Sequence, residues 1–491
     1  MLQRKMLFEL RRCVDYGNVQ SLTERMVSWS KNGNVFALKV AVEFQRISVV
    51  DVRHCFYEGM AAAVAAGKSH ALEILIATGL NADYVSAQGS MVAIGAAHGH
   101  REIVELLVRE YGANLNGRRS YPIHAAIWKQ KPWRYLFDLG ADINRKKKGQ
   151  TPLMFALETA PTRYVIELAG MTGVDINEGD KTYQSPLERA AYEGRGHIGE
   201  ILLDLGAKVD GEEVGSPLLG AIATCHANFV KRLLDDGANV GRLTEGLEGP
   251  LHLLFKQSIY DPEDQDKILK MLVAVGIDIN ETYESIPELH WQIQEAKECE
   301  WFDNHHEEPW FERVECLLRN GADVDKVDTY GNSALQLACE LHHTSHRSIL
   351  IDKLLQEQAD VTIANDAGQT VLMSGHLSTG EVNKLVMYGA ELDAVDVHGM
   401  SALHVAIFEN NPSMAKALLK NGINASIRDR FEHTARFYVE PRDTEIGTSQ
   451  SMASRSQLLE IFRRWERRIG VVWNSRDDVF DHRRQSAPPT T

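Results

Sequence analysis

Cysteine is scarce in this chain. Six cysteines occur among 491 residues, and none lies in a C-x-x-C pair. A disulfide framework needs a higher density, so the sequence predicts a protein of a reducing compartment, cytoplasmic or nuclear and not secreted. Glu9, Arg11 and Arg12 interrupt the apolar residues of the N-terminus, which is typical of a helix start and not of a secretion signal. No window approaches 18 uncharged apolar residues, which predicts that the chain has no membrane span.

Positive charge is also in deficit. The chain has 68 acidic residues against 53 lysines and arginines, for a formal net charge of −15. This balance excludes direct binding of nucleic acid or of an anionic membrane by the whole surface, although a local basic patch remains compatible with it. Apolar residues make up 44% of the chain, which predicts a folded protein.

Signatures of catalysis are missing from the sequence. It has no G-x-x-x-x-G-K-S/T loop, no G-x-G-x-x-G after a strand, no G-x-S-x-G and no H-E-x-x-H. The segments outside the clear repeats are about 55 and 60 residues long, too short for a typical catalytic domain. We therefore predict no enzymatic activity, no cofactor and no metal.

What the sequence does contain is a repeated unit of about 33 residues. Two leucine-like residues, two or more variable residues and Gly-Ala close each unit, as in Leu202-Leu203 with Gly206-Ala207. The glycine recurs at positions 79, 112, 140, 173, 206, 237, 276, 321, 389 and 422, and Gln358 stands where another is expected. A period held over this length predicts a stack of similar units. The glycine after the second helix of each unit predicts a left-handed helix end.

A second pattern opens the units. It reads Thr151-Pro152-Leu153, Ser185-Pro186-Leu187, Ser216-Pro217-Leu218, Ser333-Ala334-Leu335, Ser401-Ala402-Leu403-His404 and Tyr121-Pro122-Ile123-His124. A hydroxyl caps the free amides of a first turn, and proline is tolerated there, so the pattern predicts a helix start. We expect His124, His252 and His404 of this motif to bond between adjacent units and not to transfer protons.

These patterns together resemble the ankyrin repeat, whose motif is T-P-L-H-x-A-A, then G-H, then L-L-x-x-G-A-D-V-N. Residues 89–116 and 185–210 match it well, and the resemblance covers roughly residues 56–429. It implies an all-α solenoid of about eleven helix-turn-helix units with short β-turn or hairpin connections. It also implies a binding role, without naming the partner.

The ends of the chain are less regular. We predict degenerate capping repeats at 1–55, the ankyrin array at 56–429, a degenerate capping repeat or helix at 430–470 and a disordered tail at 471–491. Leu458, Phe462 and Trp465 form an apolar stripe in the third segment, and Arg463, Arg464, Arg467 and Arg468 surround it. This basic helix either caps the last repeat, which we favour, or binds a partner or membrane surface.

Insertions interrupt three adjacent repeats near 256–265, 294–310 and 341–346. Insertions at one repeat position stack on one edge, which predicts a single acidic and aromatic lobe. Trp301, Phe302 and Trp310 are either exposed anchors for a basic partner or they fold back to pack the loops. Histidines gather there too, at positions 305, 306, 342, 343 and 346, but without the spacing of a zinc site.

Two neighbouring turns carry six positive charges on an otherwise acidic array. They are Arg118 and Arg119, and then Arg145, Lys146, Lys147 and Lys148. On consecutive units these turns should lie side by side, where they would seat an acidic peptide or phosphate or act as a nuclear-import signal. The alternative is a solvated turn tip.

The sequence therefore predicts a non-enzymatic scaffold or adaptor, monomeric, which binds protein partners through the basic turns and the aromatic lobe. One alternative is a nuclear transcriptional co-regulator recruited by a DNA-binding partner. A second is a metal-dependent activity in the histidine-rich insertions.

Overall fold

Helices are the main regular structure of the chain in its computed structural model. The structure describes residues 2–15, 18–47, 52–117, 119–183, 185–210, 216–244, 248–256, 261–299, 310–342, 344–439, 449–469, 472–474 and 479–481. It divides into two compact units, Met1–Gly246 and Leu247–Thr491. Each unit is described by itself below.

The first unit is a series of helices with one short hairpin. Its helices are α1 (Leu2–Asp15), α2 (Val19–Lys31), α3 (Val35–Ile47), α4 (Arg53–Ala65), α5 (Ser69–Ile76), α6 (Met91–His98), α7 (Arg101–Arg109), α8 (Pro122–Trp128), α9 (Arg134–Asp138), α10 (Pro152–Thr159), α11 (Thr162–Ala169), α12 (Pro186–Tyr192), α13 (Gly196–Asp204), α14 (Pro217–Ala223) and α15 (Ala227–Asp235). The hairpin pairs β1 (Val85–Ser86) with β2 (Gly89–Ser90), antiparallel.

The second unit continues the helical pattern with longer helices. These are α16 (Pro250–Lys256), α17 (Pro262–Ala274), α18 (Glu288–Cys299), α19 (Trp310–Arg319), α20 (Ala334–Cys339), α21 (Thr344–Gln356), α22 (Thr379–Met387), α23 (Ala402–Phe408), α24 (Pro412–Asn421) and α25 (Ser449–Ile469), with 3-10 helices η1 (Val371–Met373) and η2 (Ala435–Val439). Two antiparallel hairpins join β3 (Thr282–Tyr283) to β4 (Ile286–Pro287), and β5 (Val472–Asn474) to β6 (Val479–Asp481).

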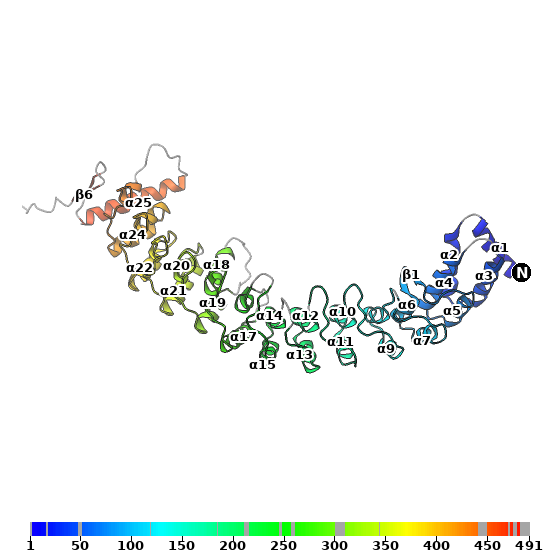
Figure 1. Cartoon of the computed structure of the whole chain (residues 1–491). Helices are drawn as coiled ribbons and strands as arrows, with labels where there is room; N and C mark the ends of the chain where they lie inside the picture. The colour runs from blue at the N-terminus through cyan, green and yellow to red at the C-terminus, as the bar shows by residue number, and fades with distance from the viewer. Residues whose placement is uncertain are drawn as a thin grey trace, which may run out of the picture. The chain divides into compact units, whose positions relative to one another are not determined.

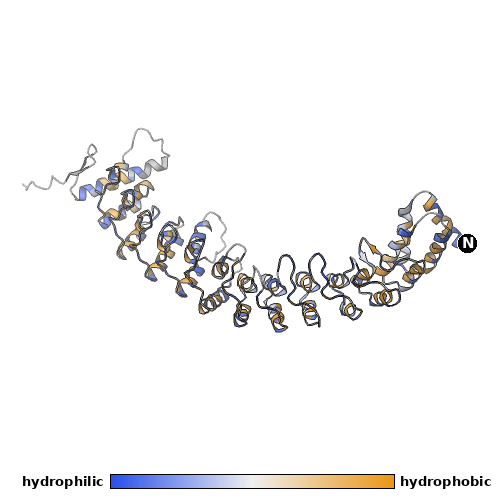
Figure 2. Ribbon diagram, viewed as in Figure 1, coloured by the Kyte–Doolittle hydropathy of each residue, from blue (hydrophilic) through white to orange (hydrophobic). Residues whose placement is uncertain are grey.

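Within each unit the helices stack in two rows (Figure 1). First helices of successive repeats contact one another, as α8 contacts α10 and α10 contacts α12, and second helices do the same from α11 to α13 to α15. Apolar residues gather where the rows meet, and polar residues lie on the outer surfaces (Figure 2). Each helix pair therefore buries its apolar side against its neighbours, which confirms the predicted all-α ankyrin-repeat architecture.

The predicted helix starts are confirmed. The hydroxyl of Thr151 accepts a bond from the Met154 amide at 3.2 Å, and that of Ser185 accepts from the Glu188 amide at 3.1 Å. Ser333 forms a reciprocal capping box with Gln336. One first helix is reduced to the single turn η1, within residues 371–373.

The predicted left-handed helix ends are also confirmed. All ten glycines of the periodic position have positive φ, from +65° to +101°. Gln358 takes the same conformation, with φ at +64°. The turn geometry is therefore imposed by the repeat even where the residue lacks the freedom of glycine.

The Asp or Asn residues after that glycine connect one repeat to the next. The Asn144 side-chain oxygen accepts from the Asp175 amide at 2.9 Å, and the Asp175 carboxylate accepts from the Asn177 amide at 3.1 Å. The inter-repeat bond recurs between Asp83 and Asn114, Asn116 and Asp142, Asn177 and Lys208, Asp210 and Asn239, Asn280 and Asp323, Asp325 and Asp360, and Asp393 and Asn424. Each side chain therefore shapes its own turn or holds the register of its neighbour.

Helices were expected in the N-terminal segment, whereas the C-terminal tail contains structure that the sequence did not indicate. Residues 1–55 include α1, α2 and α3, and the tail expected to be disordered contains the β5–β6 hairpin. Val472 and Trp473 pair with Phe480 and Asp481 there, because β-branched and aromatic residues favour extended pairing. Parts of the predicted insertions are helical: residues 262–265 lie in α17, 294–299 in α18 and 344–346 in α21, and Asp261 caps α17.

No helix in the described ranges is long and apolar enough to span a bilayer.

Candidate functional site

The two basic turns of the first unit do lie side by side. The Arg145 Nε donates to the Ser120 carbonyl at 3.2 Å, and its terminal nitrogen donates to the Gly117 carbonyl at 2.8 Å. Its guanidinium also lies 5.5 Å from the centre of the Tyr121 ring. Arg145 therefore fastens one turn to the preceding one, and its charge is largely committed to that contact.

The three lysines that follow differ in their surroundings. Lys146 forms an ion pair with Glu178 on the next turn. Lys147 is half-buried with its ammonium 5.8 Å from the centre of the Phe155 ring, and burial, then the charge of Lys148, lowers its pKa. Lys148 is exposed, with φ at +55°. The turn itself is closed by paired backbone bonds between Lys147 and Gln150.

The first basic turn contributes one described cation. Arg119 is exposed and lines a hollow of about 610 Å³ with Asp83 and Asn114. Arg118 lies outside the described residues. The predicted six-charge cluster is therefore divided: Arg145 and Lys146 serve contacts between turns, while Arg119, Lys147 and Lys148 face the surface or an aromatic ring.

Trp128 is the residue of this site that the sequence analysis missed. It ends α8 and is 59% exposed, with its ring 6.1 Å from that of Phe155 on α10. Phe155 is also 5.3 Å from the ring of His124. Lys147 thus borders an aromatic surface that Trp128 leaves open, and Lys148 follows it in the same turn. We call Trp128, Phe155, Lys147 and Lys148 the Trp128 patch.

A sequence signal for Trp128 does exist. Its position, seven residues after the first residue of the opening motif, holds Glu158, Tyr192 and Phe408 in other repeats. A bulky apolar residue at a position that elsewhere accepts glutamate marks an exposed face, but only once the repeats are aligned on their opening motif.

The histidines of the opening motif bond between repeats, as predicted. The His124 Nε2 lies 3.1 Å from the Gln150 carbonyl, and the His404 Nε2 lies 3.3 Å from the His433 carbonyl. His252 instead meets a carboxylate, with its Nδ1 2.9 Å from Glu288. Burial lowers the pKa of His124 to about 4 despite the carbonyl bond, so this ring is neutral at physiological pH.

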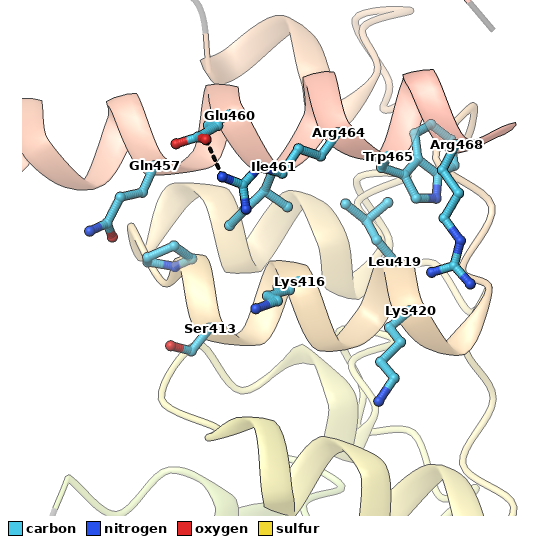
Figure 3. A pocket seen from close by; sticks show the side chains of 11 residues that line it. Ser413, Lys416, Leu419, Lys420, Gln457, Glu460, Ile461, Arg464, Trp465 and Arg468 are labelled. Carbon is cyan, nitrogen blue, oxygen red and sulfur yellow. Dashed lines mark hydrogen bonds and ion pairs between the residues drawn. The ribbon is translucent and has the colours of Figure 1, made fainter. Parts of the chain in front are cut away.

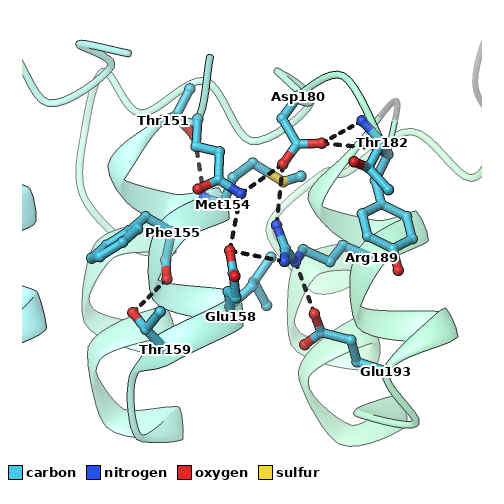
Figure 4. Close-up of polar contacts among 12 residues, drawn as sticks. Thr151, Met154, Phe155, Glu158, Thr159, Asp180, Thr182, Arg189 and Glu193 are labelled. Atoms are coloured by element: carbon cyan, nitrogen blue, oxygen red, sulfur yellow. Dashed lines mark hydrogen bonds and ion pairs between the residues drawn. The ribbon is translucent and has the colours of Figure 1, made fainter. Parts of the chain in front are cut away.

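A buried ion network lies next to the Trp128 patch (Figure 4). The Arg189 guanidinium contacts Asp180 at 3.1 Å, Glu158 at 3.1 Å and Glu193 at 2.9 Å. Burial acts to raise the pKa of Asp180, but hydrogen bonds from Tyr183, from the Gln150 side chain and from Thr182, together with the charge of Arg189, hold it below the usual value. The network ties α10 to α12, and it fixes the far side of the 145–150 turn through Gln150.

The second unit presents a different surface on its turns. The turn tips are joined by backbone bonds, from the Asp366 amide to the Tyr330 carbonyl at 3.0 Å and from the Val397 amide to the Ala367 carbonyl at 2.9 Å. Tyr330 is 69%, Val397 64% and Phe431 60% exposed. These turns therefore expose apolar side chains, where the 145–150 turn of the first unit exposes cations.

The predicted aromatic lobe is only partly described. Trp301 and Phe302 lie outside the described residues. Trp310 begins α19 and is 6% exposed, with its ring 5.2 Å from that of His346. Its ring therefore packs against the next repeat, the second of the two readings that the sequence left open, and does not stand out as an anchor.

The described part of the chain holds no group of three or more histidine, cysteine, aspartate or glutamate side chains arranged for a metal ion. His305 and His306 lie outside it. His342 and His376 do meet, with ring centres 4.3 Å apart.

Known proteins resemble this chain in two of its segments. A profile of ankyrin repeats in three copies matches residues 306–429, and a single ankyrin repeat matches residues 91–120. An ankyrin repeat protein of Rickettsia felis is 38% identical over 150 residues, which are 29% of this chain and 66% of that protein. The mouse B-cell lymphoma 3 protein homolog is 33% identical over 117 residues, 23% of this chain and 26% of that protein.

A longer match reaches an ankyrin repeat domain-containing protein of Stachybotrys chartarum, 24% identical over 57% of this chain and 14% of that protein. The crystal structure of the ankyrin repeat domain of Bcl-3 aligns with 48% of this chain and 97% of its own length, at 25% identity and a TM-score of 0.38. The matches span less than two thirds of each of these curated relatives. With the capped helix pairs and the left-handed ends described above, the two ankyrin-repeat segments and the sequence relatives place the chain: it is an ankyrin repeat protein.

Proposed function

We propose that this protein is a non-enzymatic scaffold that binds an acidic segment of a partner protein on the Trp128 patch. Ankyrin repeats are typically protein-interaction modules. The observation that carries the proposal is the exposure of the Trp128 ring beside Phe155, which Lys147 also contacts, with Lys148 exposed in the same turn. Tryptophan next to cations is the kind of group on which binding energy concentrates in protein interfaces.

The electrostatics favour an acidic partner. Lys148 is exposed and Lys147 is partly desolvated, so a carboxylate placed between them would replace lost hydration and relieve their mutual repulsion. Arg119 is exposed on the adjoining turn. An apolar side chain of the partner would cover Trp128, and its flanking carboxylates would meet the three cations.

The alternative of a nuclear co-regulator has less support from the geometry. Lys146 is paired with Glu178, and the 147–150 turn is closed by backbone bonds, so the basic residues do not form an extended segment. The discriminating experiment compares the cellular location of the protein with that of Lys146→Gln, Lys147→Gln, Lys148→Gln. An unchanged location would count against an import signal at this turn.

The proposed function is tested by quantitative affinity capture from native cells with matched variants. Trp128→Ala and the pair Lys147→Gln, Lys148→Gln should lose the same partners. The control is Phe8→Ala on α1, which removes another exposed aromatic ring outside the patch. Thermal unfolding of each variant checks that the array is intact.

A result in which both patch variants keep every partner that the Phe8→Ala control keeps would overturn the proposal. Partners that depend on Trp128 but carry no acidic segment would contradict the charge argument alone.

A further inference from the structure

A second cationic site lies between the last full repeat and the C-terminal helix. A cavity of about 430 Å³ separates α24 from α25. Pockets for small ligands or peptide side chains begin at roughly this size. Figure 3 shows side chains of both helices directed toward this space, with Trp465 and Arg468 near Leu419 and Lys420.

The charges around this cavity are unbalanced. Lys416 and Lys420 come from α24, and Arg464 and Arg468 come from α25. Glu460 is the one carboxylate in its lining, and it forms an ion pair with Arg464. Within the described ranges no carboxylate is paired with Lys416, Lys420 or Arg468, so three positive charges face the cavity without a counter-ion.

The floor of the cavity is apolar. Leu419 is buried, and Ile461 and Trp465 are partly buried beside it. An occupant therefore needs an apolar side chain for the floor and anionic groups for the rim, since neither feature alone matches the lining.

The helix that carries two of these arginines is fixed in place. Phe462 is fully buried, Arg436 of η2 reaches Glu466 at 3.3 Å, and the Arg436 guanidinium lies 5.6 Å from the Phe462 ring. Leu458 and Phe462 of the apolar stripe are thus buried, while Trp465 lines the cavity. Insertion of that stripe into a membrane would break these contacts, which favours a peptide as the occupant.

We infer that the cavity between α24 and α25 is a second binding site, which takes an acidic peptide segment of a partner protein with a phenylalanine or leucine between its carboxylates. The apolar side chain fills the space over Leu419 and Trp465. The carboxylates bind Lys416, Lys420 and Arg468 on the rim. This site is independent of the Trp128 patch, because its residues belong to the other unit.

The experiment measures fluorescence polarisation of a labelled peptide, Glu-Glu-Asp-Phe-Leu-Glu-Glu, with the full chain carrying Trp128→Ala and Lys148→Gln. That background removes the Trp128 patch from the measurement, so failure here and failure of the proposed function are separable. The pocket variant adds Lys416→Gln and Arg468→Gln. The control variant adds Arg463→Gln and Arg467→Gln, two exposed arginines of α25 that do not line the cavity.

We expect the pocket variant to bind the peptide about tenfold more weakly, as two lost ion pairs would give, and the control to stay within about twofold. A peptide with Gln in place of each acid should not bind. Added salt should weaken the binding of the acidic peptide. Equal losses in both variants would show only unspecific charge attraction and would overturn the site. Binding of phosphatidylserine vesicles without binding of the peptide would overturn it as well.

Discussion

The turns of the two units join neighbouring repeats by different means. In the first unit, the Arg145 side chain reaches back to the carbonyls of the preceding turn. In the second unit, the turns at Tyr330, Ala367 and His398 are bonded backbone to backbone with the turn that follows. Glycine permits this close approach, since a Cβ at Gly331, Gly368 or Gly399 would lie 2.9–3.2 Å from the backbone of the turn that follows.

This difference determines what each surface presents. Backbone pairing does not use the side chains of Tyr330 and Val397, which are 69% and 64% exposed. Side-chain pairing uses Arg145 and Lys146, and only part of the basic cluster stays available. Charge counted along a sequence therefore overstates the charge that a partner meets.

Gly331→Ala tests the backbone pairing of turns in the second unit most directly. Gly331 has φ at +77°, and a Cβ there would lie 2.9 Å from the backbone nitrogen of Asp366. We expect the free energy of unfolding to fall by roughly 3–4 kcal/mol, from left-handed strain together with the clash. Urea titration followed by circular dichroism measures it.

Gly149→Ala is the matched control in the first unit. Gly149 also has positive φ, at +94°, but nothing lies within 4 Å of its added Cβ. This substitution should lower the free energy of unfolding by the backbone strain alone, about 1–2 kcal/mol. Equal costs for the two substitutions would show that close approach of the turns in the second unit contributes nothing.

Arg189→Met tests the side-chain ties of the first unit. The side chain of Arg189 and that of Asp180 are almost fully buried, so removal of the cation leaves a buried carboxylate unpaired. We expect a loss of about 3 kcal/mol in the free energy of unfolding at neutral pH. The control is Arg232→Met, whose exposed pairs with Asp204 and Asp236 should change stability little.

The pH dependence of the stability lost in Arg189→Met tests whether Asp180 is the source of that loss. The folded pKa of Asp180 is below its unfolded value, so its stabilisation is present above the unfolded pKa of about 4 and is lost as pH falls through the folded pKa. The deficit of the variant should therefore shrink in acid. A deficit that is constant down to low pH would exclude this network as its source.

His124→Gln separates the inter-repeat bond from its pH sensitivity. Burial lowers the pKa of His124 to about 4, whereas an unfolded histidine titrates near 6.5. As pH falls, the unfolded state therefore binds a proton before the folded state does. The free energy of unfolding decreases by up to about 3 kcal/mol between pH 6.5 and pH 4. Glutamine should keep the bond and remove this loss, because Gln336 makes the same contact with the Gln369 carbonyl at 2.6 Å.

Urea titrations at pH 7 and pH 4.5 measure this effect. At pH 7 the variant should resemble the parent chain. A variant that loses as much stability as the parent between the two pH values would place the titration elsewhere, for instance at His290, whose pKa is also lowered by burial.

Gln358→Gly should give the smallest change, in the opposite direction. Gln358 holds a left-handed conformation that glycine occupies at the same position in the other repeats. Relief of that strain, less the extra entropy of an unfolded glycine, should stabilise the chain by about 0.5–1 kcal/mol. A thermal melt resolves such a shift, and a destabilised variant would contradict the strain argument.

Much of the local structure followed from sequence because its causes are local. A hydroxyl before Pro186 caps its own helix, and the periodic glycine ends its own helix, whatever the next repeat contains. The prediction that His124 and His404 bond between units also held, because the repeat period places the same atoms opposite one another at each step.

The binding surface was predicted less completely because it depends on contacts between repeats. Lys146 and Lys148 are equivalent in the sequence, yet only Lys146 meets Glu178, 32 positions away. Trp310 and Trp128 are both tryptophans near helix ends, but His346 covers one of them and the other stays open. Neither outcome can be predicted from the residues adjacent in the sequence.

The sequence by itself determined the period, the caps and the left-handed ends, since these arise from backbone geometry within a few residues. Tertiary structure alone decided which cations and rings reach solvent. The physical reason is that exposure is set by side chains one repeat away, as when Arg145 bonds to Gly117 and leaves Lys148 to the surface.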